Sequence, residues 1–363
     1  MKKQGKLLKL LKAAVSFALL LTAVFCVFHR LPECFTSEDS AVLAAAFTLT
    51  DGKYPSETDN LNDKKESKPG PVQPTTVCET KPIEKTTEKE RDKSGYYDSF
   101  SKHEGEAKYS IAEKNISGNA LMVDNCYIKN KTGLDLDFEA ILNDKLTFSV
   151  KKNTNSPQVL IYHTHTSEAY MDEDVDYFFE NFYSRTQNND FNVTAVGDAI
   201  AGSLEDKGIK TLHDKTVHDS TYNGSYDRSV QTVQSDMNEY KDIKVVLDIH
   251  RDALGTDECK IKPVFEYNGK KAAQIMILSG CDTDGERDFD NWQNNLNFAL
   301  KIQNTAEKMY PGMTRPISFD YFAYNEYVCD GSLLIEVGAE ANSIEEAVYT
   351  GQLLGNVLYE VLK

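Results

Sequence analysis

The chain has 363 residues, which is enough for one or two domains with a buried core. Its formal net charge is −17, and this acidic balance argues against a nucleic-acid partner, because phosphate binding needs a basic surface. The seven cysteines are scattered and odd in number, which argues against a disulfide scaffold.

The N-terminus combines a basic tip with an apolar run. Five lysines and no acidic residue lie within residues 1–12, and residues 13–28 carry no charge. Residues 1–30 therefore predict a cytoplasmic tip followed by a single transmembrane helix, whose uncharged part spans roughly 24 Å. A cleaved signal peptide is the alternative, although Phe25 and Val27 stand where a cleavage site needs small side chains. In either case we expect the remainder of the chain to be exported.

Residues 31–108 are predicted to form a disordered extracytoplasmic linker. From residue 51 onward this stretch is dense in Lys, Glu, Thr and Pro and nearly free of aliphatic side chains. Such a segment cannot bury enough apolar surface to fold. The predicted folded domain is therefore residues 109–363.

In this domain, apolar runs alternate with stretches of helical period. Runs typical of buried strands are found at residues 158–163, 243–253, 272–280 and 332–338. Shorter strands are expected at residues 119–130, 145–152 and 209–214. Helices are expected at residues 192–208, 227–241, 288–312 and 343–363, the last opened by a capping box of Ser343 and Glu346. The alternation predicts an α/β fold with a single, largely parallel twisted sheet and helices on both faces.

Residues that can bind a metal ion or move a proton follow three of the predicted strands. His163, His165 and Glu168 follow the first, His250 ends the second and Glu336 ends the fourth. Ligands of such sheets bind beyond the carboxyl ends of the strands, so we expect these side chains to meet at one edge.

These residue types fit a catalytic zinc site. Zinc in such sites takes three ligands from His and Glu or Asp and leaves a fourth position to water. The predicted ligands are His165, Glu168 and His250, with His165 preferred to His163 because it is closer to the turn. Glu336 is the predicted proton acceptor, since a carboxylate among apolar neighbours is desolvated and its pKa should rise.

Two further residues are predicted to assist the reaction. His163 would reach the bound substrate or the leaving group. Arg251 would bind a carboxylate or stabilise the oxyanion, with an ion pair to Asp252 or Asp248 as the alternative. Asp248 shares a strand face with His250 and is expected to orient a ligand.

Other side chains are weaker candidates. Tyr226 and Arg228 could border the site, and the tyrosines of "FDYFAYNEY" (residues 319–327) could line a sugar- or peptide-binding groove. Packing is the alternative for the tyrosines. His213 and His218 are expected at the surface.

The segments "VLIYHTHTSEAY", "VVLDIHRDA" and "LLIEVGAEANS" resemble the signature blocks of the stage II sporulation protein P family. That family belongs with the zinc-dependent N-acetylmuramoyl-L-alanine amidases of the type 3 fold. The likeness extends from about residue 155 to the end of the chain. The N-terminal membrane segment and the variable tether agree with the layout of that family.

The resemblance implies a Zn²⁺ enzyme that removes stem peptides from peptidoglycan and in some members also cuts peptide cross-links. It implies action from the mother-cell membrane in forespore engulfment, with the stage II sporulation proteins D and M as partners. By the same resemblance His165 and His250 match the zinc histidines, and Glu336 matches the essential glutamate. In the general amidase pattern a glutamate ligand opens the helix after the first strand. Here that helix lacks a glutamate, so Glu168 is expected to take its place.

Two alternatives remain open at this point. A zinc peptidase of the carboxypeptidase type also uses a His-x-x-Glu pair and a distant histidine. A wall-binding module that keeps the fold without the reaction is the second alternative.

Overall fold

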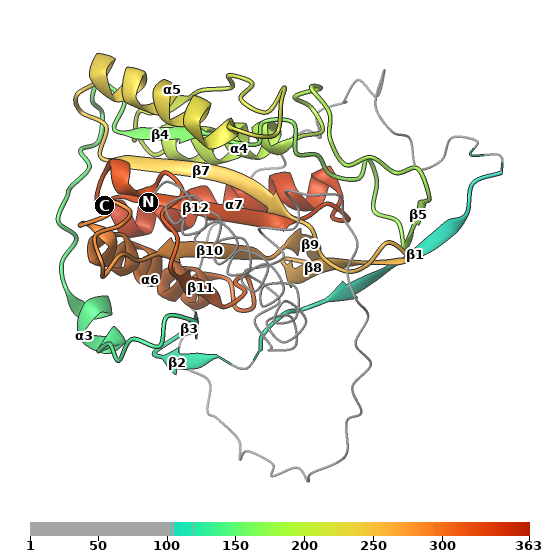
Figure 1. The fold of residues 1–363 in the computed structure, drawn as a ribbon, viewed down its shortest axis with the longest axis horizontal. Helices are drawn as coiled ribbons and strands as arrows, with labels where there is room; N and C mark the ends of the chain where they lie inside the picture. The colour runs from blue at the N-terminus through green and yellow to red at the C-terminus, as the bar shows by residue number, and fades with distance from the viewer. Residues whose placement is uncertain (1–102, 104, 119) are drawn as a thin grey trace, which may run out of the picture. The chain divides into compact units, whose positions relative to one another are not determined.

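The computed structural model describes residue 103, residues 105–118 and residues 120–363 (Figure 1). The predicted transmembrane helix and nearly all of the predicted linker therefore lie outside the described residues. Within the described part of the chain, no helix is both long and apolar enough to cross a membrane.

An eight-stranded sheet with the order β2–β3–β11–β10–β12–β7–β4–β6 organises the described part of the domain (Figure 1). Its neighbouring strands pair in parallel except at β2–β3 and β10–β12. The sheet is therefore largely parallel, as the sequence predicts. Its strands are β2 (Leu121–Val123), β3 (Cys126–Asn130), β4 (Val159–Tyr162), β6 (Thr211–His213), β7 (Val245–Asp252), β10 (Ile275–Gly280), β11 (Ile317–Asp320) and β12 (Ser332–Ala339).

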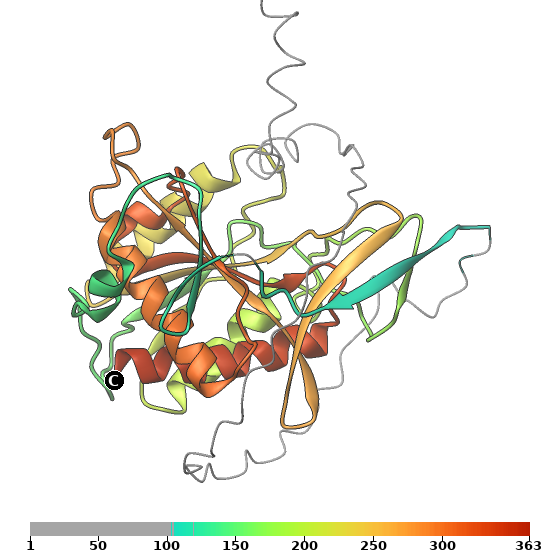
Figure 2. The same ribbon diagram turned by 90° about the horizontal axis from the view of Figure 1, so that it is seen from below.

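Helices cover both faces of this sheet (Figure 2). The alternation along β4 shows the two faces, because Val159 and Ile161 join the large core while Leu160 and Tyr162 join a smaller one. The large core is closed by α4 (Val193–Glu205), α6 (Trp292–Met309) and α7 (Ile344–Leu362). The smaller core lies under α5 (Ser225–Glu239). We call these the α4 face and the α5 face.

The expectation of a single sheet is wrong. A second sheet has the order β5–β1–β8–β9 and is formed by β1 (Lys108–Lys114), β5 (Tyr177–Phe179), β8 (Cys259–Tyr267) and β9 (Lys270–Ala273). Between β8 and β9 the chain turns at Asn268 and Gly269, with φ of 51° and 71°. An Asn-Gly pair of this kind is the strongest short signal of a β-hairpin in a sequence.

Two other expectations need correction. The run at residues 272–280 is split between the two sheets at Gln274, which is fully buried. Its Nε2 donates to the carbonyl oxygen of Gly312 (2.9 Å) and its Oε1 accepts from the backbone N–H of Ile116 (2.6 Å).

The strand expected at residues 145–152 does not form. The capping box of Ser343 and Glu346 is confirmed at the start of α7.

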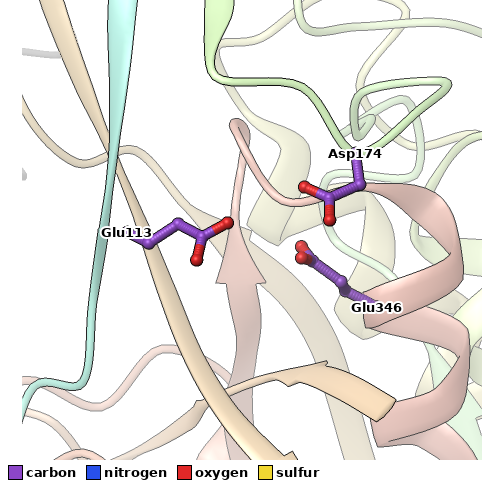
Figure 3. Close-up of side chains that lie close together, drawn as sticks. All are labelled: Glu113, Asp174 and Glu346. Carbon is purple, nitrogen blue, oxygen red and sulfur yellow. The ribbon is translucent and has the colours of Figure 1, made fainter.

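A cluster of charges joins β1, the segment before β5 and the first turn of α7. Figure 3 shows the carboxylates of Glu113, Asp174 and Glu346 turned toward one another. Among the described residues this is the one group of three potential ligands that all lie within 4.8 Å of one another. However, the buried ammonium of Lys262 contacts all three, at 3.0 Å from Glu113, 3.2 Å from Glu346 and in direct contact with Asp174. The cluster is therefore an ion-pair network centred on a lysine.

Lys262→Met should lower the free energy of unfolding by about 3 kcal/mol, because Glu346 would remain buried without its cation. Lys271→Met is the matched control. Lys271 pairs with Glu113 and Asp174 at the exposed rim, so its loss should cost about 1 kcal/mol or less. Urea unfolding of both variants measures the difference, and equal losses would contradict this account.

Candidate active site

Three neighbouring parallel strands carry the predicted residues to one edge of the main sheet. Tyr162 of β4 is in register with Asp248 of β7, and His250 of β7 is in register with Glu336 of β12. Because the strands run in the same direction, their carboxyl ends lie side by side. His250 and Glu336 are thus brought together as the sequence predicts.

The turn after β4 adds His165 and Glu168 to this edge. Glu168 Oε2 lies 3.3 Å from Nδ1 of His250 and accepts a hydrogen bond from the backbone N–H of Arg251 at 3.2 Å. The ring of His165 stands edge-on to that of His250, with 5.3 Å between the ring centroids. The three predicted zinc ligands therefore lie next to one another, from segments about 80 residues apart in the chain.

The donor atoms of this group fit a zinc ion in part. Two ligands on a tetrahedral zinc are about 3.4 Å apart, given the usual bond lengths, and His250 Nδ1 and Glu168 Oε2 are 3.3 Å apart. His165 Nδ1 is buried without a hydrogen-bond partner among the described residues. The three ligand atoms do not all come within 4.8 Å of one another in the described structure. The residue types, the pairwise distance and the unpartnered nitrogen are nevertheless those that a zinc site needs.

Electrostatics at the site follow from burial and from close opposite charges. Burial would raise the pKa of Glu168, but Arg251 and His250 outweigh burial and hold it well below its ordinary value. Burial lowers the pKa of His165 to about 4, which keeps its imidazole neutral and able to act as a ligand at neutral pH. Glu168 is thus an ionised carboxylate beside a neutral imidazole.

Asp248 takes the supporting position that the sequence predicts for it. Its Oδ1 lies 2.8 Å from His250 Nε2, on the opposite side of the ring from Glu168. It also accepts hydrogen bonds from the backbone N–H and the hydroxyl of Thr164, at 2.8 and 2.6 Å. Asp248 thereby holds the ring of His250 and the turn after β4 in one arrangement.

The structure does not bring His163 to this group. Strand alternation predicts that His163 and His165 share a face, but the turn begins directly after β4 and ends the alternation. His163 lies on the α4 face with no exposed surface, and its ring nitrogens contact Ile249 O and His213 Nε2. His165 lies on the α5 face against Tyr226. His163 is thus not placed to contact a substrate.

The two histidines expected at the surface are also enclosed. His218 is 2% exposed, and its Nδ1 lies 2.8 Å from the carbonyl oxygen of His163. The side chain of His213 is 7% exposed. Arg228 does not reach the predicted ligands, because its guanidinium bonds carbonyl oxygens of the preceding loop, including that of His218 (2.6 Å).

Arg251 is buried and holds backbone in place. Its Nε donates to the carbonyl oxygen of Ala169 (3.2 Å), and its Nη2 donates to that of Ser184 (2.9 Å). The alternative side-chain ion pair with Asp252 or Asp248 does not form among the described residues, and the predicted substrate contact stays a prediction. The residue instead fixes the segment that carries Glu168 and supplies a nearby positive charge.

Glu336 lies in a desolvated position, as the sequence predicts. Its Oε2 is buried and lacks a hydrogen-bond partner in the part of the chain that the structure describes. Burial, together with the charge of Asp252, raises its pKa to about 8 against the opposing effect of His250. A carboxyl of this kind can hold or release a proton near neutral pH.

Aromatic rings line the α5 side of the site. Tyr222 stacks on His165 with 4.7 Å between ring centroids, and Tyr226 stacks on His250 at 6.4 Å. Tyr324 stacks in turn on Tyr226 at 5.2 Å. The sequence indicated Tyr226 and Tyr324 as weaker candidates but not Tyr222, which lies in a loop without a periodic pattern.

Arg185 is a second residue that sequence reasoning missed. Its guanidinium lies 3.6 Å from Glu168 Oε1, donates to Asp219 at 2.8 Å and packs over the ring of Tyr222. It comes from the long segment between β5 and α4, where no local pattern marks it. Arg185 adds a partly exposed positive charge at the rim of the site.

Comparison with known proteins identifies the family of this chain. The sequence matches the stage II sporulation protein P family over residues 49–359, which is most of the chain. The chain belongs to this family. A curated relative is the stage II sporulation protein P of Bacillus subtilis, which is 28% identical over 229 residues. That alignment covers 58% of this chain and 53% of the relative, so the chain spans about half the length of the relative it matches.

Solved structures of amidases are also similar to this chain. The CwlD amidase of Clostridioides difficile, solved with the GerS lipoprotein, has a TM-score of 0.35 at 11% identity and covers 56% of this chain and 98% of its own. The Ami1 amidase of Mycobacterium smegmatis has a TM-score of 0.34 at 12% identity and covers 58% of this chain and 99% of its own. The family assignment rests on the sequence match.

Glu326 is the first residue of the short 3-10 helix η1 (Glu326–Val328). Its burial should make the free energy of unfolding depend on pH. It is 1% exposed, and its Oε2 accepts from the backbone N–H of Gly280 at 2.9 Å. Burial, to which the charge of Asp248 adds, raises its pKa well above its ordinary value. Since the folded state holds the proton more tightly, Glu326 contributes stability below about pH 4.5 that is lost as the pH rises through the raised folded value.

Glu326→Gln should remove this dependence. Relative to the wild type, the variant should become more stable as the pH rises from about 4 to about 8. Urea unfolding across this range measures the difference in the free energy of unfolding. A difference that stays constant with pH would contradict the prediction.

Proposed function

We propose that this protein is a membrane-anchored, zinc-dependent peptidoglycan hydrolase that cleaves the amide between N-acetylmuramic acid and L-alanine of the stem peptide. The observation that supports it best is the meeting of His165, Glu168, His250 and Glu336 at one sheet edge in a chain of the stage II sporulation protein P family. Two imidazoles, an ionised carboxylate and a second carboxyl of raised pKa are the groups that metal-assisted amide hydrolysis requires.

In this proposal the ligands are His165, Glu168 and His250. A zinc ion bound there supplies the Lewis acidity that activates a water and polarises the amide carbonyl. Glu336 accepts the proton from the attacking water at its carboxylate and donates it to the departing amine of alanine. Its raised pKa suits both steps, because the group can change protonation state near neutral pH.

The supporting residues keep this arrangement in place. Asp248 holds the face of His250 opposite Glu168, and Arg251 ties down the segment that bears Glu168. Tyr222 and Tyr226 cover the rings of the two histidines and limit the access of bulk water. These contacts leave Glu336 as the group that exchanges the proton.

The location and partners of the protein belong to the same proposal. Anchoring by residues 1–30 would place the domain outside the membrane, facing the wall between mother cell and forespore. There it would act in engulfment with the stage II sporulation proteins D and M. A peptidase that cuts cross-links and a non-catalytic wall-binding module are the competing functions, and the products and the metal content separate them.

Glu336→Gln should lower the release of stem peptides from purified peptidoglycan by a factor of about 10² to 10⁴ while leaving zinc content unchanged. The substitution keeps the shape of the side chain and removes its ability to take a proton. Mass spectrometry of the soluble fragments measures the release and identifies the bond that is cut. Glu345→Gln, the same change at an exposed position of α7, should release peptides at the wild-type rate.

Wild-type release by Glu336→Gln would remove this residue from the mechanism. Cross-link cleavage without free alanine amines would indicate the peptidase. Glycan binding by a zinc-free wild type without any release would indicate the binding module.

Glu168→Gln should weaken zinc binding by a factor of about ten or more, because an anionic ligand is replaced by a neutral amide. Metal analysis after dialysis against a chelator measures the affinity. Glu180→Gln, at an exposed position in the same segment, is the control and should bind zinc normally. Unchanged affinity in Glu168→Gln would show that another residue is the third ligand.

A further inference from the structure

A chain of polar side chains runs behind the site on the α4 face. His163 Nδ1 lies 2.8 Å from the carbonyl oxygen of Ile249, and His163 Nε2 lies 2.9 Å from Nε2 of His213. His213 Nδ1 lies 2.9 Å from Asp198 Oδ1, and Asp198 also accepts from Lys215 at 2.7 Å. The chain thus links a surface carboxylate on α4 to the backbone of β7 through two imidazoles.

The direction of two bonds in this chain follows from chemistry. The Ile249 carbonyl and the Asp198 carboxylate only accept, so the Nδ1 atoms of both rings donate. The two Nε2 atoms face each other between these two bonds. Each imidazole is therefore held at both of its ring nitrogens.

A glycine makes room for the two imidazoles. A Cβ atom at Gly197, inside α4, would lie 2.4 Å from Nε2 of His213 and 3.0 Å from Nε2 of His163. Glycine in a helix interior costs about 1 kcal/mol relative to alanine. Any larger residue at position 197 would force the imidazole pair apart.

The chain ends next to the candidate zinc ligands. The last register pair of β4 and β7 is Tyr162 with Asp248. One residue further along, the side chain of His163 bonds the carbonyl of Ile249, which directly precedes His250. His165 follows His163 by two residues. The bond between His163 and Ile249 therefore fixes the position of the turn that carries His165 relative to β7, which carries His250.

We propose that His213 is a positioning residue for the zinc site. Its ring is held by Asp198 and supports the ring of His163, whose bond to the carbonyl oxygen of Ile249 keeps His165 in place relative to His250. His213 does not contact substrate or metal. The inference rests on the proposed function, because the position it protects is that of the zinc ligands.

The positioning role is tested by two alanine substitutions in one helix. Gly197→Ala pushes the imidazoles apart, whereas a Cβ at Gly202 would meet no atom of the described residues within 4 Å. Zinc affinity, measured by competition with a chelator, should fall about 10- to 100-fold in Gly197→Ala, the range seen when outer-shell partners of a zinc site are lost. Gly202→Ala should bind zinc like the wild type.

Two variants at position 213 separate positioning from loss of fold. His213→Ala leaves α4 unchanged and should also weaken zinc binding. His213→Gln should retain more affinity, because its amide N–H can still donate to His163. Wild-type affinity in both Gly197→Ala and His213→Ala would overturn the positioning role. A wild type that binds no zinc would refute the zinc site and this role with it, whereas wild-type affinity in the variants would refute the positioning role alone.

Discussion

The parallel register of β4, β7 and β12 is the constraint on which the site depends. It places His250 directly beside Glu336 and ends β4 opposite Asp248, so the turn that follows must deliver its side chains to the same edge. A shift of one residue in β12 would turn Glu336 to the α4 face, into the large hydrophobic core. The packing of Ile335 and Val337 in that core therefore determines where the carboxyl lies.

Charge balance is the second condition for the site. Glu168 and Asp248 are buried, and they are tolerated because His250 lies between them and Arg251 is close to Glu168. The aromatic rings over His165 and His250 exclude water and make these interactions stronger.

The fold was largely predictable from local patterns. The apolar runs that became β4, β7 and β12 and the periodic stretches that became α4 to α7 are unambiguous, and the ends of those strands located His165, Glu168, His250 and Glu336. The second sheet does not follow from local patterns although Asn268-Gly269 marks its hairpin, because β1 is polar, β5 has only three residues, and both gain their pairing only from distant segments.

The roles of individual side chains could not be read in the same way. His163 and His165 are two residues apart, and only the turn after β4 sends them to opposite faces. Arg251 has the composition of a catalytic residue, yet its partners are carbonyl oxygens of a segment more than sixty residues away in the chain. Partners at such distances are set by tertiary packing, which the spacing of residues in one sequence does not encode.

The place of β1 in the second sheet has a mechanical consequence. This first described strand is bonded along both edges, antiparallel to β5 and parallel to β8, and Ile111 packs against Met171 and Phe178 of the segment that follows Glu168. A pull on Lys108 along the strand axis loads both ladders in shear, so their hydrogen bonds share the force instead of opening one after another. The domain can therefore bear tension at this end, and the tension is divided between β8 and β5, which lies in the segment that follows Glu168.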